Sequence, residues 1–335
     1  MTFHRSPSGL TNLHLFIGAD VVIFVEGGHQ SFTLDEVIDG SYSHSSVDLK
    51  FWQGMFSIFL RDGRKCEFRA IGSKLTLKSI AGLIINNQVL NVWVAMDRDH
   101  DYFHGELCIA PGILYTHGYS WENDVCSPEV IEDVFWTLAQ IARGSVPVRV
   151  EIDSLFAQVC SQLQRAVYLD ILIGFHGGSL LPRDKPDSMY KLSGPHGKPS
   201  VNQEYLSKLI DQLRVAYPRP IFRPAEITLH VTRDCVGKII ACFYYRALQF
   251  LIKQYTSLGN IQKQIISNLM IEKFVSYMNQ DRGGNIYAHY AGQFAMLDTK
   301  SDSQEKSFVK PKGYLQDLLS FLIRFIPKSR RGRRN

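Results

Sequence analysis

Acidic residues follow two short apolar runs in this sequence. Glu26 comes directly after residues 21–25, and Asp97 and Asp99 follow residues 92–96. Side chains two positions apart on a strand point the same way and lie only about 7 Å apart, because a strand rises roughly 3.3 Å per residue. If the two runs are neighbouring parallel strands, these acids converge at the carboxyl edge of a sheet, where open α/β sheets bind ligands.

Carboxylates gathered in this way predict a metal site. They repel one another at neutral pH unless a cation neutralises them, and a set of oxygen ligands favours Mg2+ or Mn2+. Two such ions about 3.5–4 Å apart activate a water and neutralise a phosphate. We therefore expect a metal-dependent enzyme that acts on phosphates, although an Asp-x-Asp pair seen alone is more often a surface turn.

The elements that must position these acids alternate along the first part of the chain. We expect three strands and two helices there, with the strands at 20–25, 66–70 and 91–96 and the helices at 48–60 and 75–85. This order is typical of a parallel α/β sheet flanked by helices. The polar, turn-rich residues 27–47 are typical of a loop or an insertion.

The second part of the chain predicts mostly helices. We expect them at 128–143, 149–168, 202–216, 236–257, 261–279 and 314–326. Residues 174–200 are rich in Gly and Pro and predict a loop. The pattern divides the chain into an α/β domain over 1–145, a mostly helical domain over 146–327 and a basic tail over 328–335.

The composition predicts a soluble, cytoplasmic protein. The 335 residues contain no apolar run of about 18, and the N-terminus lacks the pattern of a signal peptide, so we expect no membrane segment. Six cysteines without any CxxC spacing indicate neither a zinc site nor a disulfide framework.

The formal net charge of +5 is concentrated in the tail. Five basic residues lie within the last eight positions: Lys328, Arg330, Arg331, Arg333 and Arg334. They favour a polyanion such as nucleic acid as partner, with a solvated terminus as the alternative.

Three motifs together resemble the OLD-like nuclease branch of the TOPRIM-fold proteins. They are Val25-Glu26-Gly27, Asp97-x-Asp99 and Tyr119-Ser120-x-Glu122-Asn123. The first motif of that branch usually has an Asp four residues after the Glu, where this sequence has Gln30. Because Asp48-Leu49-Lys50-Phe51-Trp52 fits the second half of that motif, we interpret residues 28–47 as an insertion.

The resemblance implies a TOPRIM-like sheet and a set of site residues. The implied metal ligands are Glu26, Asp97, Asp99, Glu122 and Asp48. Ser120 would assist metal binding, Glu26 is the alternative general base, and Lys238 of Gly237-Lys238 would steady the charge on the phosphate.

The resemblance also implies a biological role. It suggests hydrolysis of host tRNA by the toxic effector of an anti-phage system, an ABC-type ATPase as regulatory partner, and a homodimer as the active form. Two alternatives stay open: a catalytically degraded TOPRIM subunit that only binds a partner, and a DNA endonuclease of the OLD type.

Several other residues have weaker signals. We expect Asp101 to be a solvated loop acid, and His100 and His104 to be loop histidines. The aromatic residues of 236–257 are expected in the core. Tyr102 is the aromatic residue better placed to contact a base.

Overall fold

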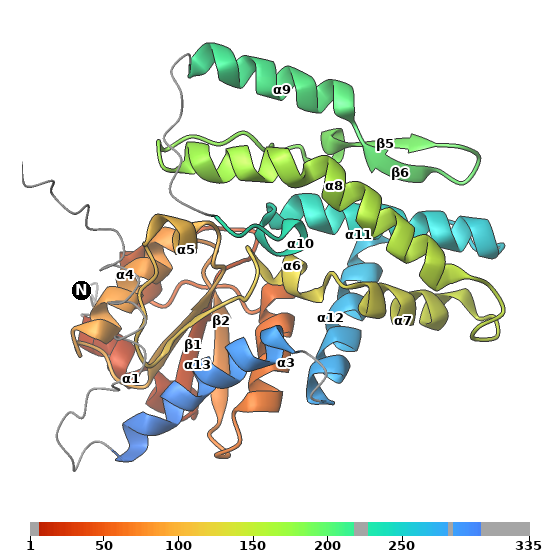
Figure 1. The fold of residues 1–335 in the computed structure, drawn as a ribbon. Coiled ribbons are helices and arrows are strands. Elements are labelled where there is room, and N and C mark those ends of the chain that lie inside the picture. Colours follow the sequence, from red (N-terminus) through yellow and green to blue (C-terminus); the bar gives the residue numbers. More distant parts are fainter. Residues whose placement is uncertain (1–6, 218–226, 281–283, 303–335) are drawn as a thin grey trace, which may run out of the picture.

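A computed structural model describes residues 7–217, 227–280 and 284–302, and its centre is a parallel β-sheet. The four strands lie in the order β2-β1-β3-β4 (Figure 1). Their bounds are Val21–Val25 for β1, Cys66–Ala70 for β2, Val92–Met96 for β3 and Ile113–Tyr115 for β4. The α/β prediction and its three strands are confirmed. β4 was not predicted, because three residues are too few for a recognisable pattern.

Helices cover both faces of the sheet. Helix α3 (Val47–Phe59) packs on the face that β1 presents through Ile23, and α4 (Lys74–Ile85) packs on the opposite face. Both helices begin at a serine that caps them, since the hydroxyls of Ser46 and Ser73 accept from backbone amides three residues on. Alternation along β1 thus gives each face of the sheet its own apolar core.

Two further helices of the sheet layer were not predicted. Helix α1 (Pro7–Ile17) packs on the α4 side through Leu10, and α13 (Asn285–Asp302) packs on the α3 side through Phe294. The segment 27–47, predicted as a loop or an insertion, contains a short helix. Residues Leu34–Ile38 form helix α2, which a capping box at Thr33 stabilises.

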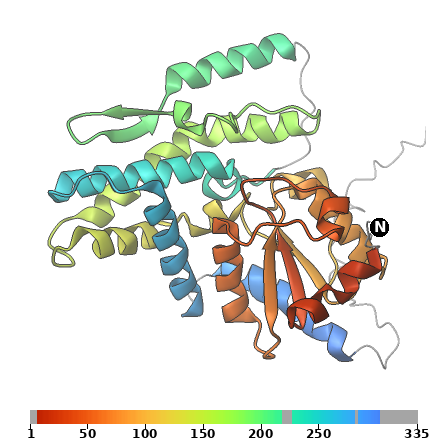
Figure 2. The same ribbon diagram turned by 180° about the vertical axis from the view of Figure 1, so that it is seen from behind.

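The mostly helical second part is confirmed. Its long helices are α7 (Pro128–Ala139), α8 (Val148–Gly174), α9 (Gln203–Ala216), α11 (Gly237–Tyr255) and α12 (Lys263–Asn279). Three short helices lie beside the sheet: α5 (Asp101–His104), α6 (Trp121–Val125) and α10 (Val231–Asp234). Figures 1 and 2 show α9 outermost, with α8 between it and α11.

The Gly- and Pro-rich stretch 174–200 is not a plain loop, so this prediction was wrong. It contains a 3-10 turn at Pro186–Met189 and an antiparallel hairpin of β5 (Tyr190–Ser193) and β6 (Lys198–Val201). Two of its glycines lie in the hairpin turn, Gly194 with φ +71° and Gly197 with φ +73°. The composition indicated a turn correctly but hid the two strands beside it.

One aromatic cluster connects the sheet layer with the C-terminal helices. The Phe51 ring of α3 lies 6.1 Å from Trp121, 6.0 Å from Phe274 and 6.2 Å from Tyr290. A single buried cluster therefore continues from the sheet into the helical part. The boundary near residue 145 stays a prediction.

The membrane helices and the cysteines are the features on which the composition led to an expectation. No helix among the described residues is long and apolar enough to cross a membrane. The six cysteines are free thiols. The helix expected at 314–326 and the basic tail with Arg330, Arg331, Arg333 and Arg334 lie outside the described residues.

Candidate metal centre

Two of the predicted acids meet at the carboxyl edge of the sheet. β1 and β3 are parallel neighbours with Val25 paired to Ala95, so Glu26 and Asp97 follow their strands side by side. The backbone amide of Asp97 donates to Oε2 of Glu26 over 3.2 Å. The parallel register predicted from sequence thus brings these two acids together.

Burial and neighbouring charges raise the pKa of the acids at this edge. Burial, with Asp99 and Asp48 nearby, raises the pKa of Glu26 to about 7. Burial and the charges of Glu26, Glu122 and Asp48 raise the pKa of Asp97 well above its usual value. A cation placed here would reverse this effect, because it favours the charged form of every carboxyl group around it.

Asp48 reaches the edge from the start of helix α3. A Cβ atom built on Gly27 would lie 2.1 Å from Oδ2 of Asp48, so the carboxylate rests directly against the backbone after β1. Burial and the charge of Glu122 raise the pKa of Asp48 to about 7. Gln30 is exposed, and its carbonyl packs against Gly72. The interpretation of 28–47 as an insertion stays a prediction.

Glu122 and Ser120 belong to helix α6, beside the start of α11. The Ser120 hydroxyl donates to Oε2 of Glu122 over 2.5 Å. A Cβ atom on Gly237 would lie 1.8 Å from Oγ of Ser120, so a glycine is required at this contact. Burial raises the pKa of Glu122, while the charges of Lys263 and Lys238 act in the opposite direction. Lys238 is exposed and electrostatically close to Glu122.

Asp99 forms an ion pair with a lysine at this edge. Its backbone is in the left-handed region at φ +49°, and its amide donates to the Tyr119 carbonyl over 2.7 Å. Its carboxylate lies 2.5 Å from Nζ of Lys74. Burial lowers the pKa of Lys74, but Asp99, Asp101 and Glu26 together outweigh this effect and the pKa is raised.

The prediction that Asp101 is a solvated loop acid was wrong. The side chain is buried at 7% exposure and lies 3.1 Å from Lys74 and 3.0 Å from Lys78. Lysine pairing offsets the cost of burying the charge. Lys74 was missed as a site residue. Its place in the Gly72-Ser73-Lys74 turn, at the start of a helix after the second strand, was the available signal.

The two histidines beside Asp99 tie the sheet to the helical part. His100 is buried and its Nε2 lies 2.9 Å from the Asp234 carbonyl, while His104 Nε2 lies 3.4 Å from the carbonyl of Ile171. Both were predicted as loop histidines, but they flank or belong to the one-turn helix α5. Such long-range contacts have no signal in the local sequence.

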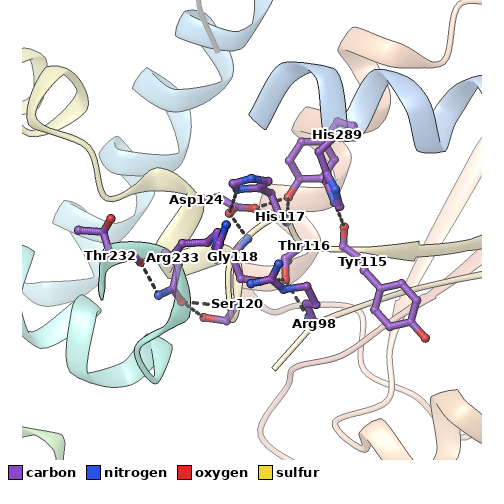
Figure 3. A network of polar contacts seen from close by, with 12 residues as sticks. Arg98, Tyr115, Thr116, His117, Gly118, Ser120, Asp124, Thr232, Arg233 and His289 are labelled. Atoms are coloured by element: carbon purple, nitrogen blue, oxygen red, sulfur yellow. Dashed lines mark hydrogen bonds and ion pairs between the residues drawn. The ribbon is translucent and has the colours of Figure 1, made fainter. Parts of the chain in front are cut away.

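A buried polar network fixes the segment that carries Ser120 (Figure 3). Arg98 pairs with Asp234 over 2.9 Å, and its amide donates to the Thr116 hydroxyl over 3.0 Å. The Asp124 carboxylate accepts from the amide of Gly118 over 2.6 Å. Buried groups paired in this way hold a segment rigidly, so Glu122 is presented from a fixed support.

The aromatic residues of 236–257 were predicted in the core, and Tyr102 was predicted as the residue better placed to contact a base. Phe243, Tyr244 and Phe250 are buried, as expected for core residues, and Tyr245 is half-buried. Tyr102 is 59% exposed, and the guanidinium of Arg98 lies 5.5 Å from its ring centre.

The donor set fits a hard divalent cation, but it is not closed around one. Among residues 7–217, 227–280 and 284–302, no three His, Cys, Asp or Glu side chains are already arranged as a metal site. Five carboxyl groups nevertheless share this edge or border it, and oxygen donors of that kind suit Mg2+ or Mn2+.

Comparison with known proteins adds no family to this description. No protein-family model matches the chain, and no curated protein matches it significantly.

Proposed function

We propose that this chain is a metal-dependent nuclease that hydrolyses phosphodiester bonds. One observation carries the proposal: Glu26, Asp48, Asp97 and Glu122, from four separate segments, lie close together at the carboxyl edge of a parallel sheet. Burial raises the pKa of each, and the charges of neighbouring acids add to this effect for Glu26, Asp48 and Asp97. Uncompensated acids at such an edge are costly and cluster at functional sites. A divalent cation is the partner that their chemistry lacks.

The residues divide into ligands and groups that act on substrate. Glu26, Asp97, Asp99, Glu122 and Asp48 would hold Mg2+ or Mn2+, which when bound supplies an activated water and neutralises the phosphate. A Glu26 with pKa near 7 suits a general base at neutral pH. Ser120 orients Glu122.

Two lysines complete the proposed site. Lys238, on the first turn of α11, lies where its charge acts on Glu122 and would steady a bound phosphate. Lys74 orients Asp99 through their ion pair. The site thus combines negative charge for the metal with positive charge for the substrate.

The motifs suggest a specific biological setting. They resemble those of AriB, the TOPRIM nuclease effector of the PARIS anti-phage system, which implies host tRNA as substrate and the ABC-type ATPase AriA as regulatory partner. A homodimer as active form and cell arrest by abortive infection belong to the same proposal.

The alternatives differ in their support. A degraded regulatory subunit was suggested by Gln30, but Asp48 supplies a carboxylate at the edge from elsewhere. A DNA endonuclease shares the metal chemistry, so only substrate choice separates it from a ribonuclease.

Incubation of purified protein with total RNA and with plasmid DNA, in Mg2+, Mn2+ or EDTA, tests the proposal. We expect metal-dependent loss of discrete tRNA species, absent in Glu26→Gln. Glu272→Gln, at an exposed position of α12, is the matched control. Folded protein that cleaves neither substrate with either metal, alone or with its ATPase, would contradict the proposal.

A further inference from the structure

A cavity of about 580 Å3 opens beside the proposed metal centre and has no part in the chemistry above. Its walls come from both parts of the molecule. Asp99, His104 and Tyr119 line it from the sheet side, and Ser179 and Arg183 line it from the segment after α8. The volume lies within the range of small-molecule sites. Because Asp99 borders both, a group bound here would lie next to the metal centre.

The arginine side of the cavity is a fixed structure. Asp170 is fully buried, and its Oδ1 accepts from the amides of Leu180 over 2.6 Å and Leu181 over 2.8 Å. Its Oδ2 lies 3.2 Å from Nη2 of Arg183. A buried carboxylate thus anchors both the chain and the guanidinium, while 37% of the Arg183 side chain stays exposed for a ligand.

A glycine brings the two walls together. A Cβ atom on Gly174 would lie 2.5 Å from Cε1 of the His104 ring, so a larger residue would displace the ring. The end of α8 therefore lies close against helix α5.

The chemistry of the wall suits a nucleotide. The Arg183 guanidinium interacts with the Tyr119 hydroxyl, so a planar cation and an aromatic ring lie together. Arginine recognises phosphates and base edges through two parallel donors, and aromatic or imidazole rings stack on bases. The Ser179 hydroxyl adds a donor and acceptor at the exposed rim.

We propose that this cavity holds the nucleotide that flanks the scissile phosphate, with Arg183 as its principal contact. The proposal rests on the proposed nuclease function and deepens it. It assigns sequence preference at one position beside the cut to residues outside the metal centre.

Nucleotide binding can be measured under conditions that prevent cleavage, and it tests the cavity independently of the metal centre. The four 5′-mononucleotides and their 2′-deoxy counterparts are titrated by calorimetry into Glu26→Gln protein in EDTA. We expect one site per chain, at least tenfold weaker binding when Arg183→Gln is added, and a change under twofold for Arg165→Gln, an exposed arginine of α8. Preference for ribose over deoxyribose would favour RNA as substrate.

A second variant guards against a folding defect, since Arg183 also contacts Asp170. Ser179→Phe fills the cavity and leaves that ion pair intact, so it should weaken binding to the same degree. Sequencing of cleavage products from Ser179→Phe with Glu26 intact should show relaxed preference at one position flanking the cut.

The outcomes separate the two proposals. Metal-dependent cleavage without nucleotide binding, or binding that neither variant weakens, would overturn the cavity assignment and leave the nuclease. Binding that depends on Arg183 in a protein that never cleaves would support a nucleotide site and overturn the nuclease.

Discussion

Oδ2 of Asp48 lies 2.1 Å from the point where a side chain at Gly27 would begin. The acid from the start of helix α3 therefore occupies the space beside the end of β1, although an entire polar segment separates the two residues in sequence. This contact makes Gly27 a requirement of the arrangement and connects the proposed metal centre to the fold.

Gly27→Ala should remove this arrangement. The new methyl group and the Asp48 carboxylate cannot share the space, so we expect at least a tenfold loss of cleavage and about 1–3 kcal/mol of lost stability. Gly28→Ala is the matched control, because Gly28 also has positive φ (+111°) but its nearest neighbour would lie 3.7 Å away. Cleavage assays and urea unfolding measure both effects, and equal losses in the two variants would refute the contact.

The Asp48 carboxyl should make metal-free protein less stable at higher pH. Its pKa is raised from 3.8 to about 7, so between these values the folded state binds more protons and stability falls as pH rises. Asp48→Asn should therefore be more stable than the parent at pH 8 in EDTA, by at least about 1 kcal/mol. Mg2+ should raise the melting temperature of the parent more than that of the variant. Thermal unfolding with and without Mg2+ checks this, and identical metal responses would remove Asp48 from the ligand set.

Lys74→Met should impair catalysis more than binding. Without the ammonium 2.5 Å away, Asp99 loses its orienting partner, and we expect kcat to fall about 10- to 100-fold. Lys78→Met is the control, since Lys78 contacts Asp101 and Glu106 but makes no ion pair with Asp99. Steady-state cleavage of a labelled oligonucleotide separates kcat from KM. An equal fall in kcat for the two variants would show that Lys74 only supports the fold.

His117 should make stability depend on pH on the acidic side. Burial, with His289 and Arg98 nearby, lowers its pKa from 6.5 to about 3. The unfolded state therefore binds the proton first, and this contribution to stability is lost as pH falls from 6.5 toward 3, with a slope of at most about 1.4 kcal/mol per pH unit. Urea unfolding between pH 4.5 and 7 should show a shallower slope for His117→Asn, whereas His196→Asn, in the exposed hairpin turn, should keep the parental slope.

The sequence predicts the sheet well because its strands are local features. Residues 21–25 and 92–96 are apolar and rich in β-branched residues, and the acids that follow each run indicate the edge where they meet. Short elements such as β4, and strands with Gly or Pro such as β6, have no such pattern. Helix α13 alternates apolar and polar residues too irregularly to be recognised.

The candidate site is only partly visible in sequence. The positions of Glu26 and Asp97 follow from the register of β1 and β3. The position of Asp48 beside Gly27 depends on how residues 28–47 fold. Asp101 was misassigned because its burial depends on Lys74 and Lys78, whose positions are set by tertiary packing. The Arg183 cavity, formed by walls from two distant parts of the chain, has no local signal.

The contact between Ser120 and Gly237 has a consequence for how the protein matures during translation. The support for Glu122 is incomplete until the ribosome has released the start of α11, and Phe51 gains its partner Phe274 later still. Since contacts so distant in sequence form slowly, a nascent chain that already carries Glu26, Asp97 and Glu122 still lacks an assembled acidic edge until α11 follows. If the chain is the nuclease proposed above, assembly in this order would keep it inactive until α11 and α12 have been made.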